Sequence, residues 1–210
     1  TGEGVAKDAA EAAKYFRQAA EQGDAEAHYS LGNCYIGGEG APKDAAEAVK
    51  WYRKAAEQNH AMTQNNLGNF YFNGQGVAKD EVQAVKWYRL AAEQGDVTAQ
   101  FNLGLRYATG KDVPQDYAEA LKWLLLAAEQ GHAEAQYNLG VMYGNGEGVP
   151  QDYIQAHFWY NLAAAQGLEE ASKWRDQVAE KMTPAQIAQA QKLASEWQPR
   201  KSEQSANEFN

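Results

Sequence analysis

The stretch GNGEGVPQDY, from Gly144 to Tyr153, has the composition of a phosphate-binding loop. Three glycines alternate with polar residues, and an acidic residue stands at the start of an expected helix. Backbone N–H groups at such a loop and helix start can hold a phosphate. A nucleotide site needs the loop once, whereas this sequence repeats it every 36 residues, with glycines at Gly2, Gly38, Gly74, Gly110 and Gly146. We therefore interpret the loop as a structural connection of each repeat and not as a nucleotide-binding site.

The histidines and the single cysteine show no catalytic or metal-binding pattern, and the motifs HExxH, GxSxG and the P-loop are absent. His60 and His132 share a repeat position that carries aspartate in two other copies, so we expect them to begin helices. We expect His28 and His157 to lie at the surface or to be partly packed. Cys34 is expected to be a small, mostly buried thiol. The sequence thus predicts no enzyme, no metal site and no cofactor.

Charge and composition exclude further classes of function. The chain has 28 acidic and 19 basic residues, a net charge of −9, which argues against a nucleic-acid partner. It has no run of about 18 apolar residues, so we expect no membrane span. One cysteine permits no intramolecular disulfide. The sequence opens in mid-pattern at TGEGVAKD, and we expect a mature or trimmed fragment.

An aspartate follows each loop at a position where a helix is expected to begin. Glu or Gln comes three residues later, an acidic variant of the capping box in which the carboxylate accepts a bond from a first-turn N–H. Glycine or asparagine stands where the helix is expected to end. The predicted starts are Asp8, Asp44, Asp80, Asp116 and Asp152, and the predicted ends are Gly23, Asn59, Gly95, Gly131 and Gly167.

A shorter helix is expected around a Leu-Gly pair, as in AEAQYNLGVMY, where Leu139 and Tyr143 share a face. Glycine inside a helix costs about 1 kcal/mol relative to alanine, yet four copies keep it. We expect a neighbouring helix backbone to approach closely there, with paired alanines of the longer helix as the matching surface. The pairs are Leu31-Gly32, Leu67-Gly68, Leu103-Gly104 and Leu139-Gly140, and the alanines are Ala55-Ala56, Ala91-Ala92 and Ala127-Ala128.

The end of the chain departs from the period. After the last full copy the glycine loop is missing, and TPAQIAQAQKLASEW follows directly. Thr183, Pro184 and Gln186 form a helix-start signature. We expect this region to be a capping unit that covers the end of the stack.

The repeat AEAQYNLGVMYGNGEGVPQDYIQAHFWYNLAAAQG resembles the Sel-one-like repeat, a relative of the tetratricopeptide repeat with a longer, glycine-rich loop between its helices. The resemblance runs from Gly2 to about Trp197. It implies an all-α fold, a right-handed α/α superhelical solenoid of 36-residue helix-turn-helix repeats with a C-terminal capping helix pair. It also implies a bacterial adaptor or binding scaffold without intrinsic catalysis. A subgroup of the family carries paired cysteines in each repeat, which this chain lacks.

The period predicts the domain organisation. We expect a single repeat domain over 1–197 and a polar tail over 198–210. Inside the domain the predicted parts are a half repeat 1–23, repeats 24–59, 60–95, 96–131 and 132–167, and the capping unit 168–197.

In the tetratricopeptide relatives the Leu-Gly helix lines the concave face. The resemblance therefore implies rows of exposed positions on this helix, which we take as candidate binding sites for a protein or peptide. The first row is Tyr29, Asn65, Phe101 and Tyr137; the second is Asn33, Asn69, Leu105 and Val141; the third is Ile36, Phe72, Ala108 and Gly144. Just before each leucine come Ser30, Asn66, Asn102 and Asn138, whose side chains are suited to hydrogen bonds with a peptide backbone.

The competing hypothesis for these rows is that their aromatic members belong to the core. The rows contain no Lys or Arg, so an extended segment with apolar side chains suits them better than an acidic C-terminus. One version lets the tail of another copy, SANEFN, occupy the groove and so drive self-association.

Two other functions remain open. The alternative is an envelope protein that binds glycan or peptidoglycan through exposed aromatics, although four tryptophans recur at one repeat position, which favours the core. A purely structural spacer would have no specific partner. The resemblance favours the bacterial periplasm or secretion over the cytoplasm. The recurring tryptophans are Trp51, Trp87, Trp123 and Trp159.

Overall fold

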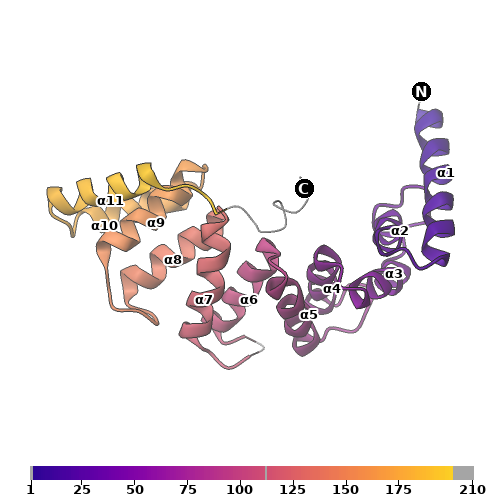
Figure 1. Cartoon of the computed structure of the whole chain (residues 1–210), viewed down its shortest axis with the longest axis horizontal. Coiled ribbons are helices and arrows are strands. Elements are labelled where there is room, and N and C mark those ends of the chain that lie inside the picture. The colour runs from indigo at the N-terminus through magenta and orange to yellow at the C-terminus, as the bar shows by residue number, and fades with distance from the viewer. Residues whose placement is uncertain (1, 112, 201–210) are drawn as a thin grey trace, which may run out of the picture. The chain divides into compact units, whose positions relative to one another are not determined.

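The computed structural model describes the backbone of residues 2–111 and 113–200, and the side chains of 8–111 and 113–200. Within these residues the fold is all-α, with eleven helices and no strand (Figure 1). The helices are α1 Gly2–Glu21, α2 Ala25–Gly37, α3 Ala45–Glu57, α4 Ala61–Asn73, α5 Glu81–Glu93, α6 Val97–Thr109, α7 Tyr117–Glu129, α8 Ala133–Asn145, α9 Tyr153–Ala165, α10 Glu169–Ala179 and α11 Pro184–Glu196.

We call the helices with the Leu-Gly pair A-helices (α2, α4, α6 and α8) and the helices that follow them B-helices (α3, α5, α7 and α9). The chain forms two compact units, Thr1–Asp96 and Val97–Asn210. In each unit an A-helix packs against the B-helix that follows it, and a B-helix packs against the next A-helix. This serial packing is typical of a solenoid, in which each helix pair buries its apolar face against its neighbours. The repeat boundaries given above stay predictions.

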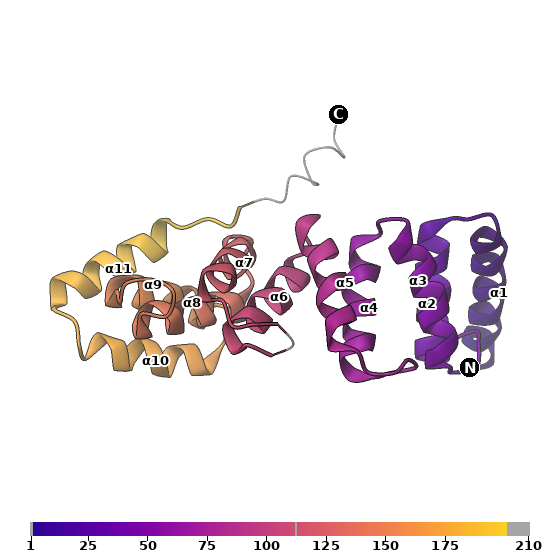
Figure 2. The same cartoon turned by 90° about the horizontal axis from the view of Figure 1, so that it is seen from below.

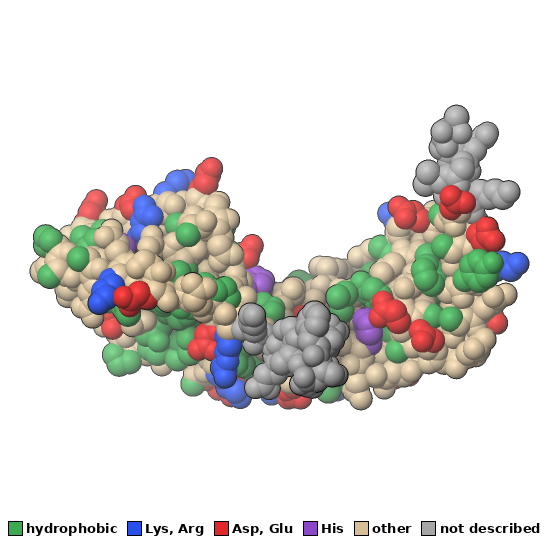
Figure 3. All heavy atoms as spheres, turned by 45° about the horizontal axis from the view of Figure 1, so that its top comes forward, with side chains coloured by type: hydrophobic (Ala, Val, Ile, Leu, Met, Phe, Trp, Pro, Cys, Tyr) green, Lys and Arg blue, Asp and Glu red, His purple; other side chains and the backbone are tan. Residues whose placement is uncertain are grey.

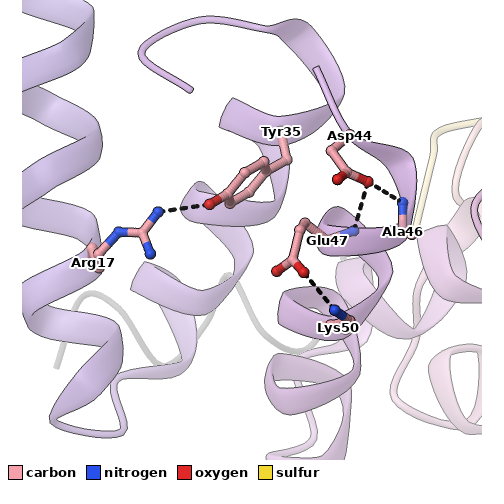
Figure 4. Close-up of polar contacts among 6 residues, drawn as sticks. All are labelled: Arg17, Tyr35, Asp44, Ala46, Glu47 and Lys50. Carbon is pink, nitrogen blue, oxygen red and sulfur yellow. Dashed lines mark hydrogen bonds and ion pairs between the residues drawn. The ribbon is translucent and has the colours of Figure 1, made fainter. Parts of the chain in front are cut away.

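Aspartate begins the B-helices, as predicted. The Asp44 carboxylate accepts hydrogen bonds from the backbone N–H groups of Ala46 at 2.9 Å and Glu47 at 3.1 Å (Figure 4). Asp80, Asp116 and Asp152 occupy the same N-terminal position in α5, α7 and α9. The return bond of a capping box is absent from α3, because the Glu47 carboxylate pairs with Lys50 at 2.5 Å instead. The aspartate alone therefore caps the helix.

The first helix does not begin where we predicted. We expected Asp8 to begin it after a glycine loop at Gly2, but α1 is helical from Gly2 onward. The later loops lie against an earlier B-helix or its equivalent: a Cβ added at Gly148 would lie 2.7 Å from the Tyr117 Cβ. The residues expected to form the loop at Gly2 belong to the helix α1 instead.

The predicted helix ends are confirmed by backbone conformation. Asn59 has a φ of 64°, and the glycines at the equivalent positions have φ near 90°. This left-handed region is favourable for glycine and tolerated by asparagine. The turn from a B-helix into the next A-helix therefore needs these residue types. The equivalent glycines are Gly23, Gly95, Gly131 and Gly167.

The A-helix glycines allow close packing, but their neighbours differ from our prediction. A Cβ added at Gly140 would lie 2.5 Å from Cδ1 and Cε1 of Tyr160. Gly32 and Gly68 meet tyrosine rings in the same way, and Gly104 meets Leu124. The atoms nearest to these glycines belong to the following B-helix and are not those of the paired alanines. Backbone atoms approach as predicted at Gly68 and Gly104, where the Ala84 oxygen and the Leu124 nitrogen would lie 3.2 Å from the added Cβ.

A glutamine side chain links successive repeats inside each unit. The Gln94 Nε2 donates to Gln64 Oε1 at 2.6 Å, and Gln166 Nε2 donates to Gln136 Oε1 at 2.8 Å. The acceptor glutamine is buried and donates its own amide to the end of the preceding B-helix, as Gln136 does to the Ala128 carbonyl at 3.1 Å. Each link satisfies polar groups that would be costly to bury alone.

The recurring tryptophans pack in the interior, as predicted. Trp123 and Trp159 are buried, and Trp51 and Trp87 are half-buried. Trp159 belongs to the core of the second unit together with Leu124 and Leu139.

The last two helices both pack against α9, and Figure 2 shows them on different sides of it. The start of α11 is the predicted capping box, because the Thr183 hydroxyl accepts from the Gln186 N–H and the Gln186 side chain accepts from the Thr183 N–H. After α11, the Arg200 N–H donates to the Glu129 carbonyl at 2.7 Å. This bond holds the described end of the tail against the end of α7.

Candidate functional site

The predicted rows lie on the A-helices and differ in exposure from the framework around them. The leucines of the Leu-Gly pairs are fully buried. Most row residues keep part of their surface exposed. Asn33 is exposed, and the half-buried members are Tyr29, Ser30, Ile36, Asn66, Asn69, Phe72, Phe101, Asn102, Leu105, Ala108, Tyr137, Asn138, Val141 and Gly144. Asn65 is an exception, because only 6% of its surface is exposed, so the expectation of an exposed contact is wrong there.

Two asparagines of the second row hold tyrosine hydroxyls. The Tyr52 hydroxyl donates to Asn33 Oδ1 at 2.6 Å, and the Tyr88 hydroxyl donates to Asn69 Oδ1 at 2.7 Å. Burial raises the pKa of Tyr52 to about 12, so its hydroxyl stays protonated and remains a donor at neutral pH. These asparagines therefore support the B-helix that lies behind them, a role that the sequence did not reveal.

Aromatic members of the first row stack on the histidines that begin the next A-helix. The Tyr29 and His60 rings are 5.1 Å apart, and Phe101 and His132 are 4.6 Å apart. Both histidines also cap their helices, as predicted, and the Thr63 N–H donates to His60 Nδ1 at 3.2 Å. The competing core hypothesis thus holds for part of these rings, while other parts remain exposed.

Polar groups just before the leucines are only partly available. The Asn138 amide donates to the Glu134 carbonyl of its own helix at 2.7 Å. One amide hydrogen and the carbonyl oxygen of this side chain still have capacity for a further partner. The prediction that this row bonds a peptide backbone stays a prediction.

The A-helix face of the second unit contains a hollow of about 570 Å³ between α8, α9 and α10, which we call the α8 hollow. Four aromatic side chains line it, and two small row residues, Val141 and Gly144, lie in the lining with these rings. The aromatic residues are Tyr137, Tyr153, Tyr160 and Trp174. Trp174 is 42% exposed, which is unusual for a residue of this size.

Sequence reasoning found Tyr137 and Val141 but missed Tyr153, Tyr160 and Trp174. Trp174 follows Asn138 by 36 residues, so it occupies an A-helix row position on α10. That spacing is visible in the sequence. The absence of a glycine loop after α10 concealed its equivalence to an A-helix.

The tyrosines of the α8 hollow lie in acidic surroundings. Burial, the Tyr137 hydroxyl and the Glu147 carboxylate raise the pKa of Tyr160. Burial and Glu170 raise the pKa of Tyr137. Both hydroxyls therefore remain neutral at physiological pH. The carboxylates of Glu147 and Glu170 near them would attract a cation.

Surface charge elsewhere is mixed. Acidic and basic side chains lie among hydrophobic ones on the visible face of each unit (Figure 3). The Arg17 guanidinium donates to the Tyr35 hydroxyl at 2.6 Å (Figure 4), and Arg53 makes the equivalent bond to Tyr71. These basic groups already serve contacts between helices.

Two histidine predictions are wrong. His28 and His157 are buried, with 4% and 3% of their surfaces exposed, where we expected surface or partly packed residues. His28 stacks on Trp51 and lies 3.1 Å from the Gln58 amide nitrogen.

Cys34 is half-buried, and burial raises the pKa of its thiol. A thiol of raised pKa is a weak nucleophile at neutral pH.

The described part of the chain was compared with two further kinds of site, a metal centre and a membrane span. Residues 8–111 and 113–200 contain no cluster of three or more His, Cys, Asp or Glu side chains that could hold a metal ion. None of the described helices has the length and apolar character needed to cross a bilayer.

Helix pairs that repeat every 36 residues and pack in series define an α/α solenoid, a class of scaffold protein. The Sel1 repeat family model matches five stretches of the chain, 1–24, 25–60, 61–96, 97–132 and 133–168. The chain belongs to the Sel1 repeat family. Repeats of this family typically mediate protein–protein interactions and generally act without catalysis.

Solved structures are similar over most of the chain. The crystal structure of c5321, a protective antigen present in uropathogenic Escherichia coli strains, is 38% identical with a TM-score of 0.79. The similarity covers 88% of this chain but only 40% of that protein. A Sel1 repeat protein from Oxalobacter formigenes is 37% identical with a TM-score of 0.75, covering 93% of this chain and 80% of the other. No curated protein sequence gives a significant match.

Proposed function

We propose that the A-helix face binds an extended segment of a protein partner and that the chain acts as an adaptor. The observation that carries this proposal is the contrast between framework and rows. Leu67 and Leu103 are fully buried, while Asn66 and Leu105 beside them stay partly exposed. A fixed scaffold that presents different side chains in each repeat is what selective binding requires.

Charge substitutions on the rows test this proposal. Asn66→Glu with Leu105→Glu places one carboxylate on an A-helix of each unit, at half-buried positions. Partners are crosslinked in the source organism and quantified after capture by wild type and by the variant. We expect at least a tenfold loss of one specific partner, because a buried unpaired charge costs several kcal/mol at an interface.

The control is Val82→Glu, since Val82 is 58% exposed on the B-helix α5. It adds one carboxylate away from the A-helix rows, and its partner capture should match wild type. Circular dichroism and thermal unfolding verify that all variants fold. Capture that is equal for wild type and the row variant would refute the proposal and direct attention to the loops or B-helices.

Glycan recognition is the alternative, and Trp174 is the observation that favours it, because an exposed tryptophan in a hollow can stack on a sugar ring. Sedimentation with purified murein separates the two functions. We also propose export to the periplasm or cell surface, a placement supported by the relative described as a protective antigen. Fractionation of source cells tests that placement.

A further inference from the structure

The α8 hollow differs from the equivalent places in the first unit at two positions. Val141 stands where the earlier copies have Asn33 and Asn69. Gly144 stands where they have a larger side chain, and in the first copy that side chain is Ile36, which packs against the cluster containing Tyr52. Both replacements remove atoms from the space in front of the B-helix tyrosine.

The first replacement also changes the hydrogen bonding of that tyrosine. Asn33 accepts the Tyr52 hydroxyl, but valine has no acceptor to offer Tyr160. Among the described residues no hydrogen bond to the Tyr160 hydroxyl is formed, and Tyr160, with 2% of its surface exposed, is part of the lining of the hollow. Its phenol oxygen therefore has capacity for a donor that enters the hollow.

The lining combines aromatic rings with acceptors. The Tyr137 and Tyr160 ring centroids are 5.7 Å apart, and Trp174 completes the aromatic wall. Asn145 and Gln177 add amide oxygens, and Asn145 is held by a bond from its amide to Glu147 at 2.9 Å. A planar group with several N–H donors would match this set of partners.

The charged residues in and around the α8 hollow indicate the charge of the group that it could bind. Glu180 lines the hollow, and Glu147 and Glu170 act on its tyrosines. The lining contains one cation, Lys181, whose ammonium already lies 5.3 Å from the centre of the Tyr153 ring. The lining itself contains one carboxylate, Glu180, beside Lys181, and Glu147 and Glu170 stand outside it near the tyrosines. Because Lys181 lies against the Tyr153 ring, the Glu180 carboxylate and the two carboxylates near the tyrosines favour a positively charged side chain in the hollow. Aromatic faces add to this preference through cation–π attraction.

We propose that the α8 hollow receives an arginine side chain from the bound segment, an inference that rests on the proposed function and names its partner chemistry. Guanidinium stacks on aromatic rings and donates to several acceptors at once, whereas an ammonium is a compact point charge. An apolar side chain would strip water from the Tyr160 hydroxyl and the amides without replacing its hydrogen bonds. A hollow of about 570 Å³ has room for one long side chain and its flanking backbone.

Blocked pentapeptides with a central residue between alanines test the proposal directly. NMR titration of the full chain follows the Trp174 indole N–H, which Trp174→Phe identifies among the six tryptophans. The central residue is arginine, citrulline, lysine or leucine. We expect saturable shifts with arginine and at least tenfold weaker binding with citrulline, which has almost the same shape but no charge.

The matched variant rebuilds the first copy in the fourth. Val141→Asn with Gly144→Ile restores the side chains found at positions 33 and 36 and should fill the hollow, with at least a tenfold loss of arginine-peptide binding. The control Val82→Asn makes the same valine change on an exposed part of α5 and should bind as wild type does. Glu180→Gln provides a second test if the double variant fails to fold. It should weaken the arginine peptide but not citrulline.

Three results would overturn the proposal: equal binding of citrulline or leucine peptides, retained binding in a folded double variant, or no saturable shift. Its failure is distinguishable from failure of the proposed function. Partner capture that is lost in Asn66→Glu with Leu105→Glu, but not in Val141→Asn with Gly144→Ile, would keep the A-helix face and remove only the arginine assignment.

Discussion

Tyr52 in the first unit and Tyr160 in the second occupy equivalent positions behind an A-helix, yet their surroundings differ. Tyr52 is tied to Asn33 and covered by neighbours that include Ile36. Tyr160 faces Val141 and a hollow. The comparison teaches that one position of the repeat can support the fold in one copy and form a candidate site in another. The change needs only the loss of an asparagine and of one large side chain.

The contact that both copies share has the largest expected effect. Gly140→Ala would place a Cβ 2.5 Å from the rigid Tyr160 ring, while Gly104→Ala would meet the flexible Leu124 side chain at 2.8 Å. We expect Gly140→Ala to destabilise the protein by about 1–3 kcal/mol through overpacking, and Gly104→Ala to have a smaller effect. Urea unfolding midpoints measure both.

In the double variant Gly140→Ala with Tyr160→Leu the new Cβ meets a leucine, as it would in Gly104→Ala, so the alanine should cost less there than beside the Tyr160 ring, when each is compared with the matching glycine protein. Equal midpoints for Gly140→Ala and Gly104→Ala would show that the tyrosine ring does not require glycine. They would also contradict the assumption that Tyr52 and Tyr160 pack against their A-helix glycines in the same way.

Removal of the hydroxyl groups gives the next largest effect and separates the two tyrosines. Tyr52→Phe should cost about 0.5–1.5 kcal/mol, because it removes the hydrogen bond to Asn33. Tyr160→Phe removes a hydroxyl for which the described residues supply no acceptor, so we expect a change close to zero. Thermal unfolding compares the pair, and equal losses would contradict the difference drawn between them.

Much of the fold could be predicted because the repeat displays its local rules five times. Aspartate or histidine at helix starts, and glycine or asparagine in the left-handed position, act through neighbouring backbone atoms. Such rules need no knowledge of tertiary contacts, as Asp44, His60 and Asn59 show. The predicted start of α1 at Asp8 was wrong; a glycine loop such as the one at Gly148 lies against another helix, and no local rule reveals that tertiary contact.

The candidate site was less predictable for a physical reason. Row positions follow from helix periodicity, but the α8 hollow depends on side chains from α8, α9 and α10. The Tyr52–Asn33 bond joins positions 19 residues apart, and no local pattern in either helix indicates it. The replacement of asparagine by Val141 was visible in the sequence. Its consequence, a Tyr160 hydroxyl without an asparagine acceptor, follows only from the structure, which places Tyr160 and Val141 in the same hollow.

The smallest expected effect concerns a third difference between copies. His28 stands where later copies have Gln64, Gln100 and Gln136, and it meets Gln58 much as Gln64 meets Gln94. Burial, with a contribution from Lys54, lowers the pKa of His28 below its usual 6.5. As pH falls through 6.5 the unfolded chain binds a proton before the folded chain does, so the free energy of unfolding decreases.

His28→Gln should therefore reduce the loss of stability between pH 7 and pH 5 by less than about 1 kcal/mol, while stability above pH 7 should change little. The glutamine can accept from Gln58, as Gln64 accepts from Gln94 at 2.6 Å. His132 and His157 also have lowered pKa values for reasons of burial, so the variant should keep part of the pH dependence. Urea titrations of wild type and variant at several pH values measure the difference. An unchanged pH slope would mean that His28 gains its proton as readily in the folded chain as in the unfolded one, and that histidine and glutamine are interchangeable at this link between repeats.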